Sequence, residues 1–270
     1  MTNQVTPHHR FEAHQHFEAH FGDENRVDME DRTTNLTDAD IADLNELAGR
    51  YPNPQSALLP MLHLVQSVDG KVSGEGVRAI ARILTMTEAQ VIGVATFYSM
   101  YHTHEVGKHL VGVCTSALCA TMGGDIIYDA IRRHLRLDED HAPGDPDTTA
   151  DGTFTLERIE CNAGCDFAPL IMLNWEYMDN MTPRKAVEIL DKLRDGQKVQ
   201  ATRGPEITSW RENERVLAGF YDGRADEGPA AGHASLAGLH LAQGYTYDET
   251  VRNANEADMN STGEGDENGQ

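Results

Sequence analysis

The four cysteines of the 270-residue chain fall into two close pairs, a pattern that can bind metal or carry out redox chemistry. Cys114 and Cys119 are spaced C-x4-C, and Cys161 and Cys165 are spaced C-x3-C. Each pair follows a run of residues that predicts a β-strand, so both pairs are expected on loops at one end of a sheet. Small residues in these loops would let backbone amides approach the sulfurs. They are Ser116, Ala117, Gly123, Gly124, Ala163 and Gly164.

Two paired sets of thiolates suit a [2Fe–2S] cluster, because each iron takes two thiolates and bridging sulfides complete its shell. A tetrahedral zinc site takes the same four ligands, although zinc knuckles favour C-x2-C spacing. A disulfide is disfavoured in a reducing compartment, and the C-x-x-C of a thioredoxin-type redox motif is absent. Four buried structural cysteines are a further alternative. Spacing alone favours the cluster over zinc and leaves both open.

The charge and hydropathy of the chain exclude several classes of function. Lys plus Arg number 22 and Asp plus Glu number 44, which gives a formal net charge of −22. Such a chain should repel nucleic acid and anionic lipid, whose binding depends on cationic side chains. No run of about 18 apolar residues is present, so we expect no membrane insertion. Residues 1–20 lack the apolar region of a secretory signal, which predicts a cytoplasmic protein.

The elements that must position the cysteines predict a mixed α/β (α+β) fold. Residues 38–104 predict a helical domain, with a helix start at Thr37 and an Asn53-Pro54 cap before a second helix. Thr85 and Glu88 fit the capping box of a further helix. Residues 105–200 predict a sheet domain in the order β-α-β-β-α. Its strands are expected at 109–113, 153–160 and 170–173, and its helices at 125–137 and 182–196.

Both ends of the chain have few regular signals. Residues 1–37 are acidic, contain His8, His9, His14, His16 and His20, and predict a disordered tail. Residues 201–270 predict a C-terminal extension with few strong elements, acidic and disordered from about 245. A metal-binding role for the histidines is possible, but a solvated polar tail is the preferred interpretation, since no cysteine accompanies them.

One glycine motif matches a dinucleotide-binding pattern. The run from Gly74 to Ala79 reads G-x-G-x-x-A, which requires a preceding strand in a βαβ unit. Residues 54–68 predict a helix instead. We therefore interpret the glycines as an interhelical turn and assign no nicotinamide site. Phe97, Tyr98 and Tyr101 could face a partner, although aromatic residues at helical spacing are more often part of a core.

Several motifs in order resemble one family over more than half of the chain. Residues 93–100 (GVATFYSM) resemble the helix before a ferredoxin domain. Residues 113–124 resemble a first ligand loop, and residues 148–156 with 160–169 resemble a second. Together they are similar to the E subunits of NADH-quinone oxidoreductase (respiratory complex I), which are thioredoxin-like [2Fe–2S] ferredoxins. Residues 204–220 resemble an extension found in some actinobacterial members.

The resemblance implies a fold, a cofactor and a partner. It implies an N-terminal helical bundle followed by a thioredoxin-like [2Fe–2S] ferredoxin domain, with the cluster held by Cys114, Cys119, Cys161 and Cys165. It implies an electron-transfer subunit that is not catalytic alone and that exchanges single electrons with the flavin of the NADH-binding F subunit. Other peripheral-arm subunits would be further partners, and the chain would be peripheral on the inner face of the membrane. The alternatives are a diaphorase-module subunit of an NAD-linked hydrogenase or formate dehydrogenase, and a zinc-stabilised interaction module.

One position in the second loop departs from the usual family pattern. The family often has Cys-Leu-Gly-Ala-Cys, whereas this chain has Asn162 directly after Cys161. The ligand spacing is unchanged, so the resemblance still implies the same four ligands. Because Asn162 is polar, its side chain could reach a sulfur and shift the reduction potential.

Overall fold

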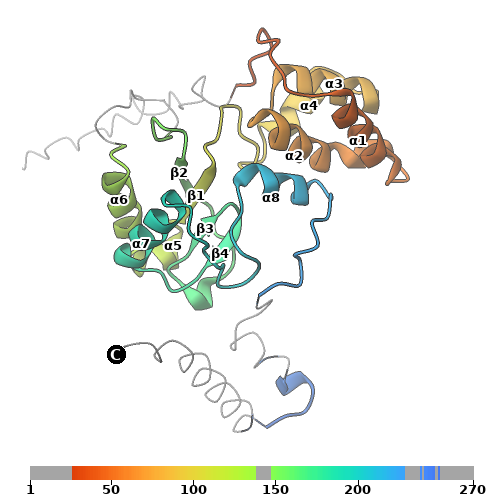
Figure 1. The fold of residues 1–270 in the computed structure, drawn as a ribbon. Coiled ribbons are helices and arrows are strands. Elements are labelled where there is room, and N and C mark those ends of the chain that lie inside the picture. The colour runs from red at the N-terminus through yellow and green to blue at the C-terminus, as the bar shows by residue number, and fades with distance from the viewer. Residues whose placement is uncertain (1–25, 138–146, 229–237, 239, 247–248, 250–270) are drawn as a thin grey trace, which may run out of the picture.

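The computed structural model describes residues 26–137, 147–228, 238, 240–246 and 249, and it has a helical domain, a sheet domain and a C-terminal helix (Figure 1). The helical domain contains α1 (Asp38–Gly49), η2 (Pro54–Ala57), α2 (Leu58–Asp69), α3 (Gly74–Leu84) and α4 (Glu88–Ala95). The sheet domain contains β1 (His109–Cys114), α5 (Ala117–Thr121), α6 (Gly124–His134), β2 (Phe154–Ile159), η3 (Cys165–Phe167), β3 (Ile171–Leu173), β4 (Glu176–Met178) and α7 (Pro183–Arg194). A further helix, α8 (Trp210–Leu217), follows. Of the two tails predicted to be disordered, 1–37 and about 245–270, the parts at 1–25, which contain the five histidines, and at 250–270 lie outside the described residues.

The first helices begin where the sequence predicts them. Thr37 caps α1 and forms a capping box with Asp40, and the side chain of Asn53 accepts from the Gln55 amide ahead of α2. The predicted capping box at Thr85 is wrong. Thr85 has φ 53° and ends α3, and the box of α4 is formed two residues later by Thr87 and Gln90. Thr85 and Thr87 offer the same pattern, and the structure uses the second.

The glycine motif opens a helix and is not the interhelical turn that we expected. α3 begins at Gly74 and is capped by Ser73. A Cβ on Gly74 would lie 2.6 Å from the Asp28 carbonyl oxygen, and one on Gly76 would overlap a Val65 methyl. The glycines therefore allow close packing of chain segments. The element before the motif is the helix α2, so the strand required for dinucleotide binding is absent here, as predicted.

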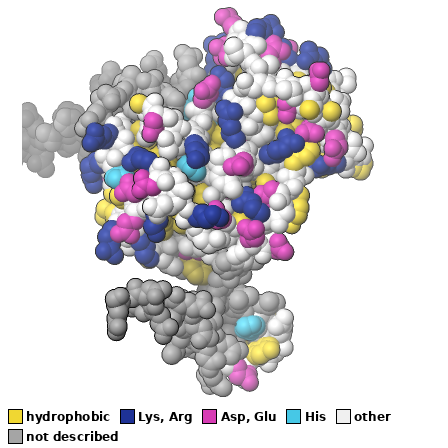
Figure 2. All heavy atoms as spheres, in the orientation of Figure 1, with side chains coloured by type: hydrophobic (Ala, Val, Ile, Leu, Met, Phe, Trp, Pro, Cys, Tyr) yellow, Lys and Arg dark blue, Asp and Glu magenta, His cyan; other side chains and the backbone are white. Residues whose placement is uncertain are grey.

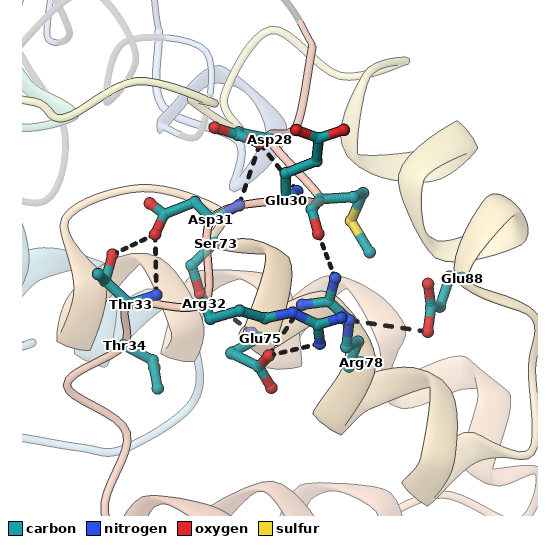
Figure 3. A network of polar contacts seen from close by, with 12 residues as sticks. Asp28, Glu30, Asp31, Arg32, Thr33, Thr34, Ser73, Glu75, Arg78 and Glu88 are labelled. Atoms are coloured by element: carbon teal, nitrogen blue, oxygen red, sulfur yellow. Dashed lines mark hydrogen bonds and ion pairs between the residues drawn. The ribbon is translucent and has the colours of Figure 1, made fainter.

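Residues 26–37 form an ordered strap against the helical domain, which differs from the disorder expected before residue 38. Val27 is buried in the core of that domain. Arg32 and Arg78 both pair with Glu75, at 3.0 and 2.9 Å, so the strap and α3 share one carboxylate (Figure 3). Composition predicted a solvated tail because the strap has few apolar residues. Its contacts with distant residues are both apolar, at Val27, Met29 and Leu36, and polar, at Arg32.

The four strands of the sheet lie in the order β2-β1-β3-β4 (Figure 1). β1 and β2 are parallel, whereas β3 runs antiparallel to both β1 and β4. The predicted strands are present, but β4 is additional. It pairs with β3 through a tight turn at Asn174 and Trp175, which both have positive φ. Asn174 suits that backbone conformation, but Trp is an unusual residue for it, so the sequence gives only a weak turn signal here.

One face of the sheet is covered by α6 and α7, which pack side by side. The apolar residues of this core come from alternate positions of three strands and from both helices. They include Val111, Val113, Phe154, Leu156, Ile171, Leu173, Ile127, Ile131, Ala186 and Leu190. The alternation places Leu110, Gly112 and Cys114 toward the opposite face. Among the described helices, none is long and apolar enough to cross a membrane.

The helix α8 joins the two domains, although we expected few strong elements after residue 196. It packs against α2, and Figure 1 shows it between the helical domain and the sheet. Its Trp210 is fully buried, and so is Glu214. The Glu214 carboxylate contacts His63 Nδ1 at 2.6 Å and accepts from Gln66 at 2.8 Å and Trp175 at 3.0 Å. These contacts link α2, α8 and the β3–β4 turn.

Candidate metal centre

The parallel pair β1 and β2 carries both cysteine pairs to one edge of the sheet. Cys114 is the last residue of β1 and lies in register with Ile159, the last residue of β2. Cys161 follows two residues later. Because the carboxyl ends of parallel strands meet at the same edge, the two loops lie next to each other, as the sequence predicts.

The first cysteine loop is buried and closely packed. Cys114 is 1% exposed, and Cys119, on the short helix α5, is 2% exposed. The chain then turns back over the loop at Gly124, the first residue of α6. A Cβ at Gly124 would lie 2.5 Å from the Cys114 carbonyl oxygen and 3.0 Å from that of Cys119. Only glycine fits here without a shift of the backbone.

The second cysteine loop lies at the surface. Cys161 is exposed and Cys165, the first residue of η3, is partly buried. Their Sγ atoms are 3.6 Å apart. The backbone reverses at Ala163, where φ is 59°, and the Ala163 amide donates to Cys161 Sγ at 3.4 Å. This loop therefore brings two sulfurs together and points one amide at one of them.

A third segment, between η3 and β3, closes the site. Ala168 and Leu170 are buried against the first cysteine pair. The Leu170 carbonyl accepts from the Cys114 amide at 3.2 Å, and the Leu170 amide donates to the Cys119 sulfur. The Ala168-Pro169 peptide is cis. The motif comparison included Ala168 and Pro169, but only the fold shows that Leu170 contacts both buried cysteines.

The four thiols interact with one another across the two loops. Burial raises the pKa of the Cys119 thiol to about 11; the Leu170 amide opposes this rise, and the neighbouring Cys114 and the more distant Cys165 add to it. The pKa of Cys165 is raised first by its hydrogen bond with Cys161, and also by Cys114. Bringing four potential negative charges into one place opposes ionisation. A bound cation would reverse that effect, since metal binding requires thiolates.

The donor set fits a two-metal cluster better than a single ion. Two thiolates on one tetrahedral metal lie about 3.8 Å apart, given metal–sulfur bonds of about 2.3 Å, and the Cys161–Cys165 separation is 3.6 Å. Within the described ranges, no three His, Cys, Asp or Glu side chains are close enough to hold one ion. Two adjacent thiol pairs therefore suit two irons with bridging sulfides. A single zinc would have to draw all four sulfurs onto one centre.

We expected that the Asn162 side chain could reach a sulfur, but it forms a hydrogen bond elsewhere. Its Nδ2 donates to the Glu160 carbonyl at 3.0 Å, and its own carbonyl accepts from the Tyr177 hydroxyl at 2.6 Å. Tyr177 and Arg203, which both contact this loop, were missed by sequence analysis. They are distant in sequence from the cysteines and belong to no motif, so only the pairing of β4 with residue 203 reveals them.

The surface of the molecule mixes charges with exposed apolar side chains, some of which lie in or beside the first cysteine loop. Figure 2 shows acidic and basic side chains interspersed on one face, without a continuous patch of one sign. Phe97 is 77% exposed and Tyr98 40%, whereas Tyr101 is buried, so the three aromatic residues divide between surface and core. Three further exposed apolar residues follow the first cysteine pair or lie within it. They are Leu118, Met122 and Ile126.

Comparison with known proteins places the sequence among iron–sulfur proteins. Residues 44–194 match the family model of the thioredoxin-like [2Fe–2S] ferredoxins. The E subunit of NADH-quinone oxidoreductase from Mycobacterium tuberculosis is 48% identical over 202 residues, which cover 74% of this chain and 78% of the relative. The same protein of Mycobacterium bovis has the same identity and coverage. NADH-quinone oxidoreductase subunit 2 of Thermus thermophilus is 32% identical over 165 residues, 60% of this chain and 88% of that one.

Solved structures give a more distant likeness. An NAD+-reducing [NiFe]-hydrogenase in the air-oxidised state matches with a TM-score of 0.44 and 15% identity. The match covers 52% of this chain and 23% of the hydrogenase chain, so this chain spans about a quarter of that protein's length.

Proposed function

This chain belongs to the thioredoxin-like [2Fe–2S] ferredoxin family, and we propose that it is an electron-transfer subunit of NADH-quinone oxidoreductase. The observation that carries this proposal is the meeting of two cysteine pairs at one edge of the sheet, where β1 and β2 end in register. The mycobacterial relatives support the choice of complex, because they align over most of their length.

The four cysteines are proposed as the cluster ligands. Cys114 and Cys119 hold one iron and Cys161 and Cys165 hold the other, since each pair lies on one loop. The bound cluster supplies one-electron transfer. The protein contributes the surroundings: the first pair is shielded from water, and amides of Ala163 and the segment before β3 approach the sulfurs. Such amides and the degree of burial set the reduction potential.

The partner is proposed to be the flavin- and NADH-binding F subunit of the same complex. Hydride transfer moves two electrons, whereas the cluster accepts one, so a flavin must stand between NADH and this chain. The exposed apolar residues Leu118, Met122 and Ile126, beside the first ligand loop, support a protein contact there. Through the complex, with its other peripheral-arm subunits, the chain acts on the inner face of the cell membrane and in contact with the cytoplasm.

Metal and sulfide analysis tests the cofactor. Anaerobically purified full-length chain should contain two irons and two acid-labile sulfides, and reduction should give a rhombic low-temperature EPR signal from one spin per cluster. Stoichiometric zinc without sulfide would instead indicate a zinc-stabilised interaction module.

Reduction by NADH tests the partner. The oxidised chain should keep its visible spectrum when NADH is added anaerobically, and should bleach once the flavoprotein subunit is also present. The control is flavoprotein with NADH but without this chain. Fast stoichiometric bleaching by NADH alone, with flavin contamination excluded, would mean that this chain contains a cofactor site of its own.

A further inference from the structure

We propose that Arg203 raises the reduction potential of the cluster by holding a buried positive charge against the second ligand loop. The inference rests on the proposed function, because it concerns the cluster held by the four cysteines. Arg203 lies outside both ligand loops, in the extension after the sheet domain. It acts on the cluster through the loop and is proposed as a positioning and charge-setting residue, not as a ligand.

The guanidinium of Arg203 lies directly against the loop. A Cβ built on Gly164, which precedes Cys165, would lie 2.7 Å from Arg203 Nη2. The Arg203 Cζ atom is 4.0 Å from the ring centre of Tyr177 and 5.2 Å from that of Phe167. Phe167 is the last residue of η3, the turn that Cys165 begins. Arg203 therefore occupies the space that a side chain at position 164 would take.

The backbone fixes Arg203 in this position. Residue 203 forms an isolated antiparallel bridge with Tyr177 of β4. The Thr202 amide donates to the Tyr177 carbonyl at 2.9 Å, and the Thr202 hydroxyl donates to the same oxygen at 2.8 Å. Tyr177 in turn donates its hydroxyl proton to the Asn162 carbonyl at 2.6 Å. The edge strand β4 therefore holds both the second cysteine loop and Arg203, which contacts that loop.

The charge of Arg203 is shielded from water and incompletely paired. Its side chain is 17% exposed, and Nη2 lies 2.8 Å from Asp179 Oδ1, whose side chain is 8% exposed. The buried Nε atom has no hydrogen-bond partner among the described residues. Arginine stays protonated in proteins, so this position carries a full positive charge. Asp179 offsets part of it, and the unpaired Nε leaves the guanidinium with donor capacity beyond that one carboxylate.

A buried charge acts on a redox centre through the change in charge on reduction. The cluster gains one negative charge when it takes an electron, and a nearby cation stabilises that form, which raises the potential. The effect is strong where water is excluded, because the effective dielectric is low there. Asp166, which follows Cys165 directly, also raises the pKa of the Cys165 thiol, but its carboxylate is exposed, so solvent weakens its effect. Arg203 and Asp179 are the shielded charges, and their effects on the potential have opposite signs.

The opposite signs give a test that a structural role cannot imitate. Redox titrations of the full-length chain, followed by EPR, should place the midpoint of Arg203→Met below that of wild type. Asp179→Asn should move the midpoint above wild type, and Arg203→Lys should stay near it. Both neutral variants lose the same ion pair, so mere loosening of the loop would shift both in one direction. Arg215→Met is the matched control, since Arg215 pairs with Asp43 at 2.6 Å and lies over the Phe220 ring.

The outcomes separate this inference from the function on which it rests. Wild-type chain without two irons and two sulfides would overturn the proposed function and this inference with it. Variants that keep the cluster but shift in the same direction, or not at all, would overturn the inference alone. If Arg203→Met holds no cluster, Asp179→Asn and Arg203→Lys decide: an upward shift in the first with little change in the second supports it, and any other result contradicts it.

Discussion

The two cysteine loops of this chain hold their proposed ligands in different ways. The first encloses Cys114 and Cys119 at 1% and 2% exposure, and it is completed within a few residues by α5 and Gly124. The second leaves Cys161 exposed, and its backbone is held by side chains from much later in the chain. The first loop is therefore part of the core, whereas the second is a surface loop held by contacts from residues later in the chain.

This difference predicts which loop should determine the stability of the site and which should determine its reduction potential. Stability should depend on the first loop, because substitutions there disturb close-packed backbone. The reduction potential and its adjustment should depend more on the second loop, because charges and hydrogen bonds beside it change without disturbing the core. Substitutions at matched positions of both loops test whether the two loops differ in this way.

The largest effect is expected from removing the cysteines themselves. Each of Cys114→Ala, Cys119→Ala, Cys161→Ala and Cys165→Ala should lose or badly destabilise the cluster, because one iron is left with a single protein thiolate. Iron and sulfide content per chain, with the visible spectrum, measures the loss. A variant that kept a full, stable cluster with an unchanged spectrum would show that its cysteine is not a ligand.

The apoproteins of the same variants extend the comparison to stability. Without the cluster, Cys119→Ala should lower the free energy of unfolding by about 1 kcal/mol through lost buried contacts, whereas the exposed Cys161→Ala should leave it unchanged. Urea unfolding of metal-free protein measures both. Equal losses would mean that the two loops do not differ in packing.

The next effect is expected at the glycine of each loop. Gly124→Ala would meet two carbonyl oxygens of the backbone, which cannot easily move, so it should destabilise by about 1–3 kcal/mol and weaken cluster retention. Gly164→Ala would meet Arg203 Nη2 and a Leu170 methyl, which are side-chain ends, and should cost less. Gly93→Ala is the control, because nothing lies within 4 Å of its added Cβ. A larger loss for Gly164→Ala than for Gly124→Ala would reverse the comparison.

A pH effect is expected at the opposite end of β1 from Cys114, away from both loops. His109 is 3% exposed, and burial lowers its pKa to about 4, with the charge of Lys108 adding to the effect. Its Nδ1 lies 3.0 Å from Asn174 Nδ2, so neutral His109 accepts this hydrogen bond. An unfolded histidine takes its proton near pH 6.5. The stabilising contribution of His109 is therefore complete above pH 6.5 and declines as the pH falls toward 4.

The measurement compares wild type with His109→Gln in urea at several pH values. Between pH 7 and pH 4.5, wild type should lose on the order of 1–3 kcal/mol more than the variant. Above pH 7.5 both forms are neutral at this position, so that range gives the cost of the substitution itself. Parallel curves for the two proteins would mean that His109 does not titrate with unfolding.

The sequence predicts the main strands and helices of this fold well. It predicts poorly the short or peripheral segments that connect them. Strands near 109, 154 and 171 and the flanking helices follow from apolar patterning, and their parallel pairing brings the cysteines together. β4 has only three residues and a turn through Trp175, so its local signal is weak. α8 has a local signal that our sequence analysis missed, because Ser209 and Glu212 form the capping box at its start. The strap at 26–37 has too few apolar residues to predict order. For β4 and the strap, contacts with distant residues decide, and these are not visible in a local pattern.

The residues of the candidate site show the same contrast between local and distant signals. Spacing proposes Cys114, Cys119, Cys161 and Cys165 as ligands, because the pattern within each loop is local. It does not reveal Leu170, whose two backbone groups contact the buried pair, or Arg203, which reaches the second loop through β4. Candidate ligands can thus be proposed from the sequence, whereas the residues that contact their loops require the fold.

The smallest effect is expected from Tyr177→Phe, which removes one hydroxyl. This variant tests whether the second loop is held independently of the first. The hydroxyl donates to the Asn162 carbonyl at 2.6 Å, and its loss should cost about 0.5–1.5 kcal/mol, the usual net value of one hydrogen bond. The ring and its contact with Arg203 remain, so the cluster should still assemble with two irons. Amide hydrogen exchange should rise in residues 161–165 and stay unchanged in residues 114–119, because the hydroxyl that is removed bonds to the second loop, whereas the ring that packs against the first cysteine pair remains. Tyr101→Phe is a matched control, since its hydroxyl donates to the Leu59 carbonyl inside the helical domain. Faster exchange in both ligand loops of Tyr177→Phe would mean that they move as one unit, and the second loop would then not be fastened independently.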